Sequence, residues 1–215
     1  MPRVFANNRL VFALSPLALI GICATVQVVA GLFIGAWAAV PTVLSFWLVI
    51  ALLLHWHSGV PGAWARFKRP VGSPIWSVLA VVAGLLSLQG FLGNWQLLAD
   101  APLVVAWLVF ALVNPWFEES YFRGLLIDST ASWGRIASLL YSSAWFAATA
   151  LIWGIHSEAL RKPEAIGAIF VGGLVWGLAY QRTGSLRWCV VGHMLANLLG
   201  LAALVLLNVF DPTVG

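Results

Sequence analysis

Apolar residues run through almost the whole chain in long blocks, and a few polar or small residues separate each block from the next. Crossing about 30 Å of hydrocarbon takes about 20 apolar residues of α-helix, and the blocks have roughly this length. We therefore predict an all-α, polytopic transmembrane helical bundle with about seven spans. The spans are expected, to within a few residues at each end, at 10–37, 41–56, 76–92, 102–127, 141–160, 165–181 and 186–209.

The third predicted span is followed by residues that interrupt an apolar helix, namely Gly90, Gly93, Asn94 and Asp100. A re-entrant segment there is therefore an alternative to a simple span and loop.

The apolar block that follows Arg3 and Arg9 is longer than the 7 to 15 residues of a signal-peptide core. We interpret it as a retained signal anchor.

Composition leaves little room for anything outside the membrane. Of the 215 residues, 62% are hydrophobic and 8% are charged, whereas a soluble domain has about a quarter of its residues charged. We therefore expect one integral membrane domain over residues 1–215, with no separate soluble domain.

The basic residues predict the orientation of the chain, because short cytoplasmic loops are enriched in Lys and Arg. With a cytoplasmic N-terminus, nine basic residues fall on the cytoplasmic side and only Arg161 and Lys162 fall on the other. The nine are Arg3, Arg9, Arg66, Lys68, Arg69, Arg123, Arg135, Arg182 and Arg187. Their spread over many short loops indicates topology signals and not a nucleic-acid patch.

Ionisable side chains at membrane depth are costly, so they tend to be kept where they are paired or used. On the fourth predicted span, Glu119 and Arg123 lie four residues apart and share a helix face. Glu118 points elsewhere, with no cation on its own helix, and is a candidate general base. The alternative is a buried Glu-Glu-Arg ion cluster that only fastens helices together.

A second pair lies on the last predicted span, where His193 and Asn197 are also four residues apart and face the same way. Two hydrogen-bond donors on one face could stabilise an oxyanion. The alternative is that both form interhelical hydrogen bonds, which are common in membrane bundles.

Depth along the helices gives a separate expectation, at about 1.5 Å of rise per residue. Glu118 and Asn197 then lie about 15 and 17 Å from the cytoplasmic ends of their helices. His156 reaches a similar depth if its helix begins near Tyr141, but is too deep if the helix begins at Arg135. We therefore expect residues 129–140 to lie outside the span.

The run from Glu118 to Gly124, with sequence EESYFRG, resembles the EExxxR motif of the CPBP family, the CAAX proteases and bacteriocin-processing enzymes, also called the Abi family. Ile155–His156 is similar to the end of the second family motif, and the run from His193 to Asn197 resembles the third, HxxxN. The resemblance covers about 115–199. In the family a Phe commonly stands four residues before the second-motif histidine, and here that position is Ile152.

The resemblance implies a glutamate-dependent intramembrane endopeptidase with its catalytic core in residues 100–200. Glu118 and His156 would activate a water, Glu119 and Arg123 would shape the site, and His193 and Asn197 would stabilise the oxyanion. The implied partners are the lipid bilayer and a membrane-associated protein or peptide substrate, with no cofactor, no metal and no nucleic acid. The implied location is a bacterial cell membrane, and the oligomeric state stays undetermined.

Three other interpretations remain open. A zinc protease would use the same residue types, but no HExxH is present and the candidates lie on three separate helices. A small transporter also keeps buried carboxylates and histidines, although we find no repeated half. A non-catalytic immunity or scaffold protein would tolerate Glu118→Gln, whereas a protease would not.

Overall fold

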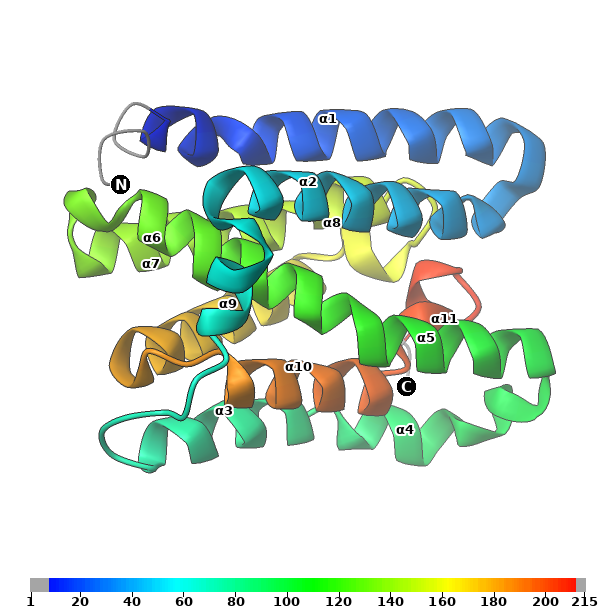
Figure 1. Cartoon of the computed structure of the whole chain (residues 1–215). Coiled ribbons are helices and arrows are strands. Elements are labelled where there is room, and N and C mark those ends of the chain that lie inside the picture. Colours follow the sequence, from blue (N-terminus) through cyan, green and yellow to red (C-terminus); the bar gives the residue numbers. More distant parts are fainter. Residues whose placement is uncertain (1–7, 212–215) are drawn as a thin grey trace.

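The computed structural model describes residues 8–211, and these residues form helices joined by short turns, with no strand (Figure 1). Arg3 lies outside the described residues. The longer helices are α1 (Arg9–Ile34), α2 (Ala39–Ala65), α3 (Ile75–Leu85), α5 (Ala101–Glu118), α7 (Arg135–Ala148), α9 (Pro163–Thr183) and α10 (Arg187–Leu199). The shorter ones are α4 (Leu88–Asn94), α6 (Ile127–Ser129), α8 (Ala150–Trp153) and α11 (Ala202–Leu206), with single turns η1 (Gly35–Ala38), η2 (Trp95–Ala99), η4 (Ala131–Trp133) and η5 (Ala159–Arg161), and a π-helical segment η3 (Glu119–Leu126).

Five helical stretches among the described residues are long and apolar enough to cross a membrane: Arg9–Ala65, Ile75–Ala99, Ala101–Ser129, Arg135–Trp153 and Pro163–Thr183. Large apolar side chains on the outside of the bundle are widely exposed, for example Leu32 at 78% and Phe33 at 82%. Contact of such a surface with lipid tails carries no hydrophobic cost, whereas its exposure to water would be unfavourable. The chain is an integral, multi-pass membrane protein.

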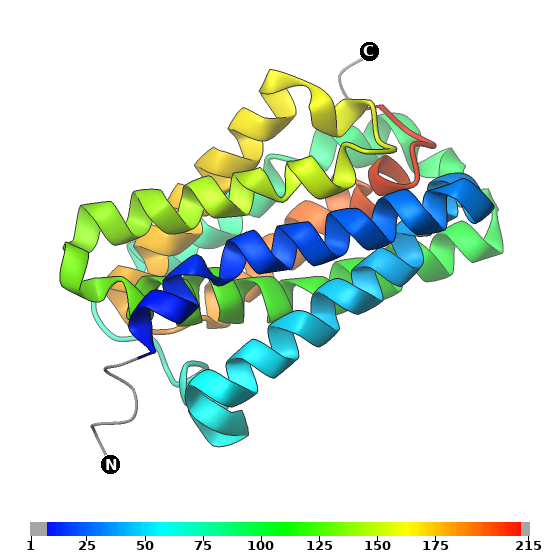
Figure 2. The same cartoon turned by 90° about the horizontal axis from the view of Figure 1, so that it is seen from above.

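The first of these stretches folds back on itself. Gly35, the first residue of η1, has a φ of 55°, a conformation that glycine adopts without strain. Figures 1 and 2 show α1 and α2 side by side and antiparallel beyond this turn. α2 runs to Ala65, beyond the predicted end at residue 56, and is interrupted at Gly59, which also has a positive φ. The turn therefore separates the first two predicted spans.

Other predicted helix boundaries are also wrong, including the end of the fifth span, which lies at Trp153 and not at residue 160. α7 begins at Arg135 and not near residue 141, because Gly134, with a φ of 95°, ends the turn after α6 and lets the next helix start at once. Residues from 135 onward are thus part of the helix and do not lie outside it. The last predicted span is also broken, since α10 ends at Leu199 after 13 residues and Leu201 takes a φ of 50°.

Small residues bring neighbouring helices close together. A Cβ on Gly192 of α10 would overlap the Ala80 carbonyl of α3, and a Cβ on Gly84 of α3 would overlap the Gly192 carbonyl. On the other side of the bundle, Gly173 of α9 lies against Ser143 of α7. Packing of this kind replaces hydrophobic driving force inside a bilayer, and it fixes α10 where the site needs it.

Hydrogen bonds tie the loops together at each end of the bundle. At one end, Leu186 N–H donates to the Arg66 carbonyl at 2.9 Å, and Val71 N–H donates to the Thr183 carbonyl at 3.1 Å. Besides Arg66 this end carries Lys68, Arg69, Arg135, Arg182 and Arg187. At the other end, the Lys162 ammonium lies 2.7 Å from the Asp211 carboxylate. The basic loops therefore gather at one end.

Candidate active site

The candidate site begins where α5 changes its winding. Glu118 is the last residue of α5, and Glu119 and Arg123 lie in the π-helical segment η3, of which every residue is buried. Pro115 precedes this change and lacks an N–H group for the α-helical ladder. π-Helical turns are rare and occur frequently at functional sites. The predicted Glu119–Arg123 pair is confirmed, with Arg123 Nη1 3.2 Å from Glu119 Oε1.

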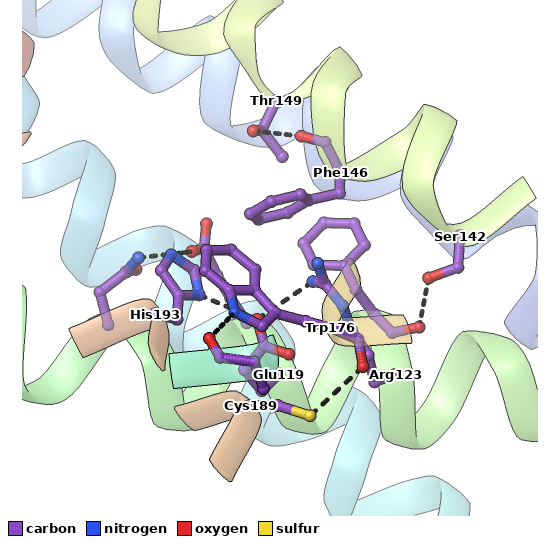
Figure 3. A network of polar contacts seen from close by, with 12 residues as sticks. Glu119, Arg123, Ser142, Phe146, Thr149, Trp176, Cys189 and His193 are labelled. Atoms are coloured by element: carbon purple, nitrogen blue, oxygen red, sulfur yellow. Dashed lines mark hydrogen bonds and ion pairs between the residues drawn. The ribbon is translucent and has the colours of Figure 1, made fainter. Parts of the chain in front are cut away.

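His193 of α10 lies between the two consecutive glutamates. Its Nδ1 is 2.8 Å from Glu119 Oε1 and its Nε2 is 3.3 Å from Glu118 Oε2. The expectation that Glu118 points away from the Glu119 cluster is therefore wrong, because the two ring nitrogens reach both carboxylates at once. Figure 3 shows His193 of α10 beside Glu119 and Arg123, which both come from η3.

The two contacts of His193 bear on the charge of the cluster. A neutral imidazole carries one N–H group and so donates to only one carboxylate. Nδ1 is hydrogen-bonded to Glu119, whereas Nε2 faces Glu118 at an ion-pair distance of 3.3 Å, so a proton on each nitrogen would favour both contacts. With His193 protonated in this way, two carboxylates face two cations, and the buried cluster is electrically neutral. Such pairing of opposite charges makes their burial more tolerable in a low-dielectric interior.

Aromatic rings enclose the imidazole and the guanidinium. The Trp176 ring stacks on His193 with centroids 4.5 Å apart, and its indole N–H donates to the Ala80 carbonyl at 3.0 Å. The Phe146 ring lies edge-on to His193 at 5.5 Å and under Arg123, whose guanidinium carbon is 4.2 Å from the ring centroid. These rings fix the imidazole plane and exclude water around it.

Several polar atoms of the cluster lack a hydrogen-bond partner among the described residues. They are the three nitrogens of the fully buried Arg123 side chain, Glu119 Oε2 and Asn197 Nδ2. Asn197 lies one turn beyond His193 on α10 and is 8% exposed. Unpaired buried donors are costly and each calls for an explanation. An incoming carbonyl oxygen would supply the missing acceptor.

Asn114 takes a larger part in the site than the sequence suggested. Its Nδ2 donates to Glu118 Oε2 at 2.6 Å, and its side chain is 1% exposed. The sequence shows Asn114 four residues before Glu118 on the same helix, a spacing that allows this contact. The four-residue spacing is therefore the sequence feature that could have predicted the hydrogen bond from Asn114 to Glu118.

The structure does not place His156 in the cluster. It follows α8, its Nε2 lies 3.4 Å from the Gln27 carbonyl of α1, and its ring sits against Gly31. No hydrogen bond or ion pair of the described residues joins it to Glu118. Because α7 begins at Arg135, six residues earlier than expected, His156 is carried about 9 Å further along the bundle.

Phe146 shows where the second family motif falls instead. It is the phenylalanine that contacts both Arg123 and His193, whereas Ile152 has no such contact. The residue four positions after Phe146 is Ala150, which is buried at 4% exposure. The geometry therefore favours 146–150 over 152–156 as the second motif, with alanine at the position of the family's histidine.

The zinc alternative finds no ligand set in this arrangement. Among residues 8–211, no group of three or more His, Cys, Asp and Glu side chains is placed to hold a metal ion. Cys23 and Cys189 are both buried as free thiols. The glutamates of the site are instead paired with Arg123 and His193.

Comparison with known proteins gives the family. Residues 100–199 match the family model described as type II CAAX prenyl endopeptidase Rce1-like. Neither the curated proteins nor the solved structures contain a match to the chain. The matched range begins just before α5 and ends with α10, so it contains Glu118, Glu119, Arg123, His193 and Asn197. Residues 100–199 of the chain therefore form an Rce1-like domain of the type II CAAX prenyl endopeptidase kind, from the CPBP or Abi family.

Proposed function

We propose that the chain is an intramembrane endopeptidase that hydrolyses a peptide bond in a membrane-associated protein or peptide. The observation that carries the proposal is the buried contact of His193 with both Glu118 and Glu119, within the domain that matches the endopeptidase family. A carboxylate held by an imidazole in a low-dielectric bundle is suited to accept a proton from water.

The proposed mechanism uses Glu118 as general base. It takes a proton from a water whose oxygen attacks the scissile carbonyl carbon, and the proton passes to the leaving amine nitrogen as the peptide bond breaks. His193 has both nitrogens directed at carboxylates, so we assign it to holding Glu118 in place, instead of the oxyanion role expected from the sequence. The unpartnered Asn197 Nδ2 is the proposed oxyanion donor, with Glu119 and Arg123 maintaining the charge balance.

The proposed setting is one integral membrane domain over residues 1–215, with its catalytic core in 100–200. We propose seven crossings of the bilayer with the N-terminus and the basic loops in the cytoplasm. The shortness of α10 is compatible with this topology because α11 continues the same part of the chain beyond the break. No cofactor enters the proposed reaction.

A second candidate function is a non-catalytic membrane protein that binds the same class of peptide. It is favoured by one observation, the alanine at position 150, where the family's second motif has a histidine. In such a protein the Glu118–His193–Glu119 contact would fasten α5, η3 and α10 together and would not transfer protons.

The experiment that tests the proposal uses purified protein in liposomes with a library of lipid-anchored, quenched-fluorescence peptides. We expect cleavage by the unaltered protein and a loss of about a hundredfold or more in Glu118→Gln. The matched control is Glu164→Gln, because Glu164 is an exposed glutamate in the first turn of α9. Peptide binding without cleavage, equal in the unaltered protein and in Glu118→Gln, would replace the protease with the non-catalytic candidate.

A further inference from the structure

The Glu118 carboxylate is held on one oxygen only. Asn114 Nδ2 and His193 Nε2 both contact Oε2, at 2.6 and 3.3 Å. Oε1 receives no hydrogen bond from the described residues and is not sealed in the interior, in contrast to Glu119 Oε2. The two oxygens of this carboxylate are therefore inequivalent, and Oε1 is the one open to another molecule.

The orientation of the Asn114 amide is set from a different helix. The indole Nε1 of Trp47, on α2, lies 2.9 Å from Asn114 Oδ1. An indole N–H is a donor only, so the atom that faces it must be the amide oxygen. The NH₂ group is then directed at Glu118. Rotating the amide by 180° would break both bonds and place the amide oxygen against the carboxylate.

The Trp47 indole is itself held in place. It stacks on Phe117 with centroids 5.5 Å apart and an interplanar angle of 11°. It also forms part of the wall of a cavity of about 630 Å³ between α2, α5 and α11, which is lined almost wholly by apolar side chains. An apolar wall offers the indole N–H no competing acceptor, so its bond to Asn114 persists.

From these contacts we propose that Trp47 and Asn114 are positioning residues that fix the Glu118 carboxylate, so that Oε1 is the oxygen that accepts the proton from water. The chain of contacts runs from α2 through α5 to α10 as Trp47, Asn114, Glu118 and His193. Trp47 lies outside residues 100–199, so the N-terminal hairpin completes the site. This inference rests on the proposed function for its catalytic consequence.

The test begins with Trp47→Phe, which keeps a ring to stack on Phe117 and removes the N–H. We expect kcat to fall by about tenfold with KM unchanged, the effect of one lost hydrogen bond. Asn114→Ala should fall further, and Trp47→Phe should add nothing in the Asn114→Ala background, because the two residues act through one path. The control is Trp107→Phe, whose indole donates to the Leu198 backbone carbonyl at 3.0 Å. An unchanged kcat in Trp47→Phe, or additive losses in the double variant, would overturn the inference.

A second readout separates this inference from the proposed function. Dicyclohexylcarbodiimide enters membranes and reacts with protonated carboxyl groups, and mass spectrometry locates the adduct at Glu118. Without the Asn114 donor the carboxylate is less stabilised, so we expect labelling of Glu118 in Trp47→Phe and Asn114→Ala to be several-fold faster than in the unaltered protein and in Trp107→Phe. Faster labelling in a protein that cleaves no peptide would retain the positioning role and refute the protease. Cleavage by the unaltered protein, with labelling and cleavage rates unchanged in Trp47→Phe and Asn114→Ala, would retain the protease and refute the positioning role.

Discussion

His193 lies with its Nδ1 2.8 Å from Glu119 Oε1, a contact that joins α10 to the π-helical segment η3 across 74 residues of sequence. Glu119 also pairs with Arg123, so one carboxylate oxygen faces a guanidinium and an imidazole in a space that water does not reach. The contact has consequences for stability as well as for catalysis, because removing one member leaves the others charged and buried.

Replacing Glu119 by Gln should destabilise the protein strongly. Arg123 is fully buried and Glu119 is its only carboxylate partner among the described residues, so the variant leaves an uncompensated charge. We expect the free energy of unfolding to fall by about 3–5 kcal/mol. The measurement is reversible unfolding in mixed micelles with increasing sodium dodecyl sulfate.

Two further variants show whether the loss comes from the unpaired charge. Adding Arg123→Met to Glu119→Gln should restore most of the stability, since no buried cation remains. Asp211→Asn removes the partly exposed pair with Lys162 and should cost no more than about 1 kcal/mol. Equal losses in Glu119→Gln and Asp211→Asn would contradict the burial argument.

His156 and His193 should differ sharply when each is replaced by Ala. Because His156 contacts Gln27 and Gly31 of α1, its loss should leave the cleavage rate within about threefold of the unaltered protein, as expected for a site outside the reaction. Loss of His193 should lower the rate by about a hundredfold or more, since it removes the imidazole that contacts the proposed general base Glu118. Initial rates on a cleaved library peptide provide the comparison, and an equal loss in both variants would return His156 to the mechanism.

The sequence predicted one contact of the site because helical spacing is a local property. Glu119 and Arg123 pair as their four-residue separation indicates. The relation between Glu118 and Glu119 was wrong, because the pattern assumed α-helical winding and the chain is π-helical from Glu119 onward. The two nitrogens of the His193 ring contact Glu118 and Glu119, and spacing within one helix does not predict such a contact between helices.

His156 was misplaced for a different reason. The position of a helix along the bundle depends on where its first turn begins, and Gly134 allowed α7 to begin at Arg135. Phe146 is an apolar residue within an apolar helix, so the sequence did not predict its contact with Arg123, which depends on tertiary packing. Similarly, the break at Leu201 lies inside an unbroken apolar run, where hydropathy gives no warning of a turn.

The close approach of α3 and α10 should be sensitive to a single methyl group. Gly192→Ala places a Cβ against the Ala80 carbonyl, which is backbone and cannot turn aside. Overpacking of this kind costs about 1–3 kcal/mol and shifts α10, so both the thermal midpoint in detergent and the cleavage rate should fall. Gly21→Ala is the control, because nothing lies within 4 Å of a Cβ there. A stable, active Gly192→Ala protein would show that α10 need not lie this close to α3.

The orientation of the chain can be tested with single added cysteines, because the native Cys23 and Cys189 are 0% and 1% exposed. Arg69→Cys lies in the basic loops and Glu164→Cys at the opposite end of the bundle, and both positions are exposed. A membrane-impermeant maleimide should label Glu164→Cys in intact cells and Arg69→Cys only after the membrane is permeabilised. The reverse pattern would place the N-terminus outside.

A variant at position 150 tests whether the chain is an active protease or the non-catalytic candidate, in which alanine replaces the second-motif histidine. Ala150 is the first residue of α8, four residues after Phe146, and its side chain is buried. We expect Ala150→His to supply a second imidazole near Glu118 and to raise the cleavage rate by about tenfold or more. A well-positioned acid or base contributes about a hundredfold or more, and an added side chain is expected to reach only part of that. The measurement is the initial rate on the lipid-anchored peptides, at equal folded protein concentration.

The control for this gain is Ala148→His, which adds the same side chain two residues earlier on a different helix face. If the unaltered protein is inactive and only Ala150→His cleaves, the native chain is the non-catalytic candidate and its cluster is a complete proton-transfer site apart from one imidazole. If the unaltered protein is active and Ala150→His is slower, the native reaction runs through His193 alone, and a second imidazole competes with it for the Glu118 proton. Activity in both added-histidine variants would instead point to an imidazole effect that does not depend on the Phe146 face.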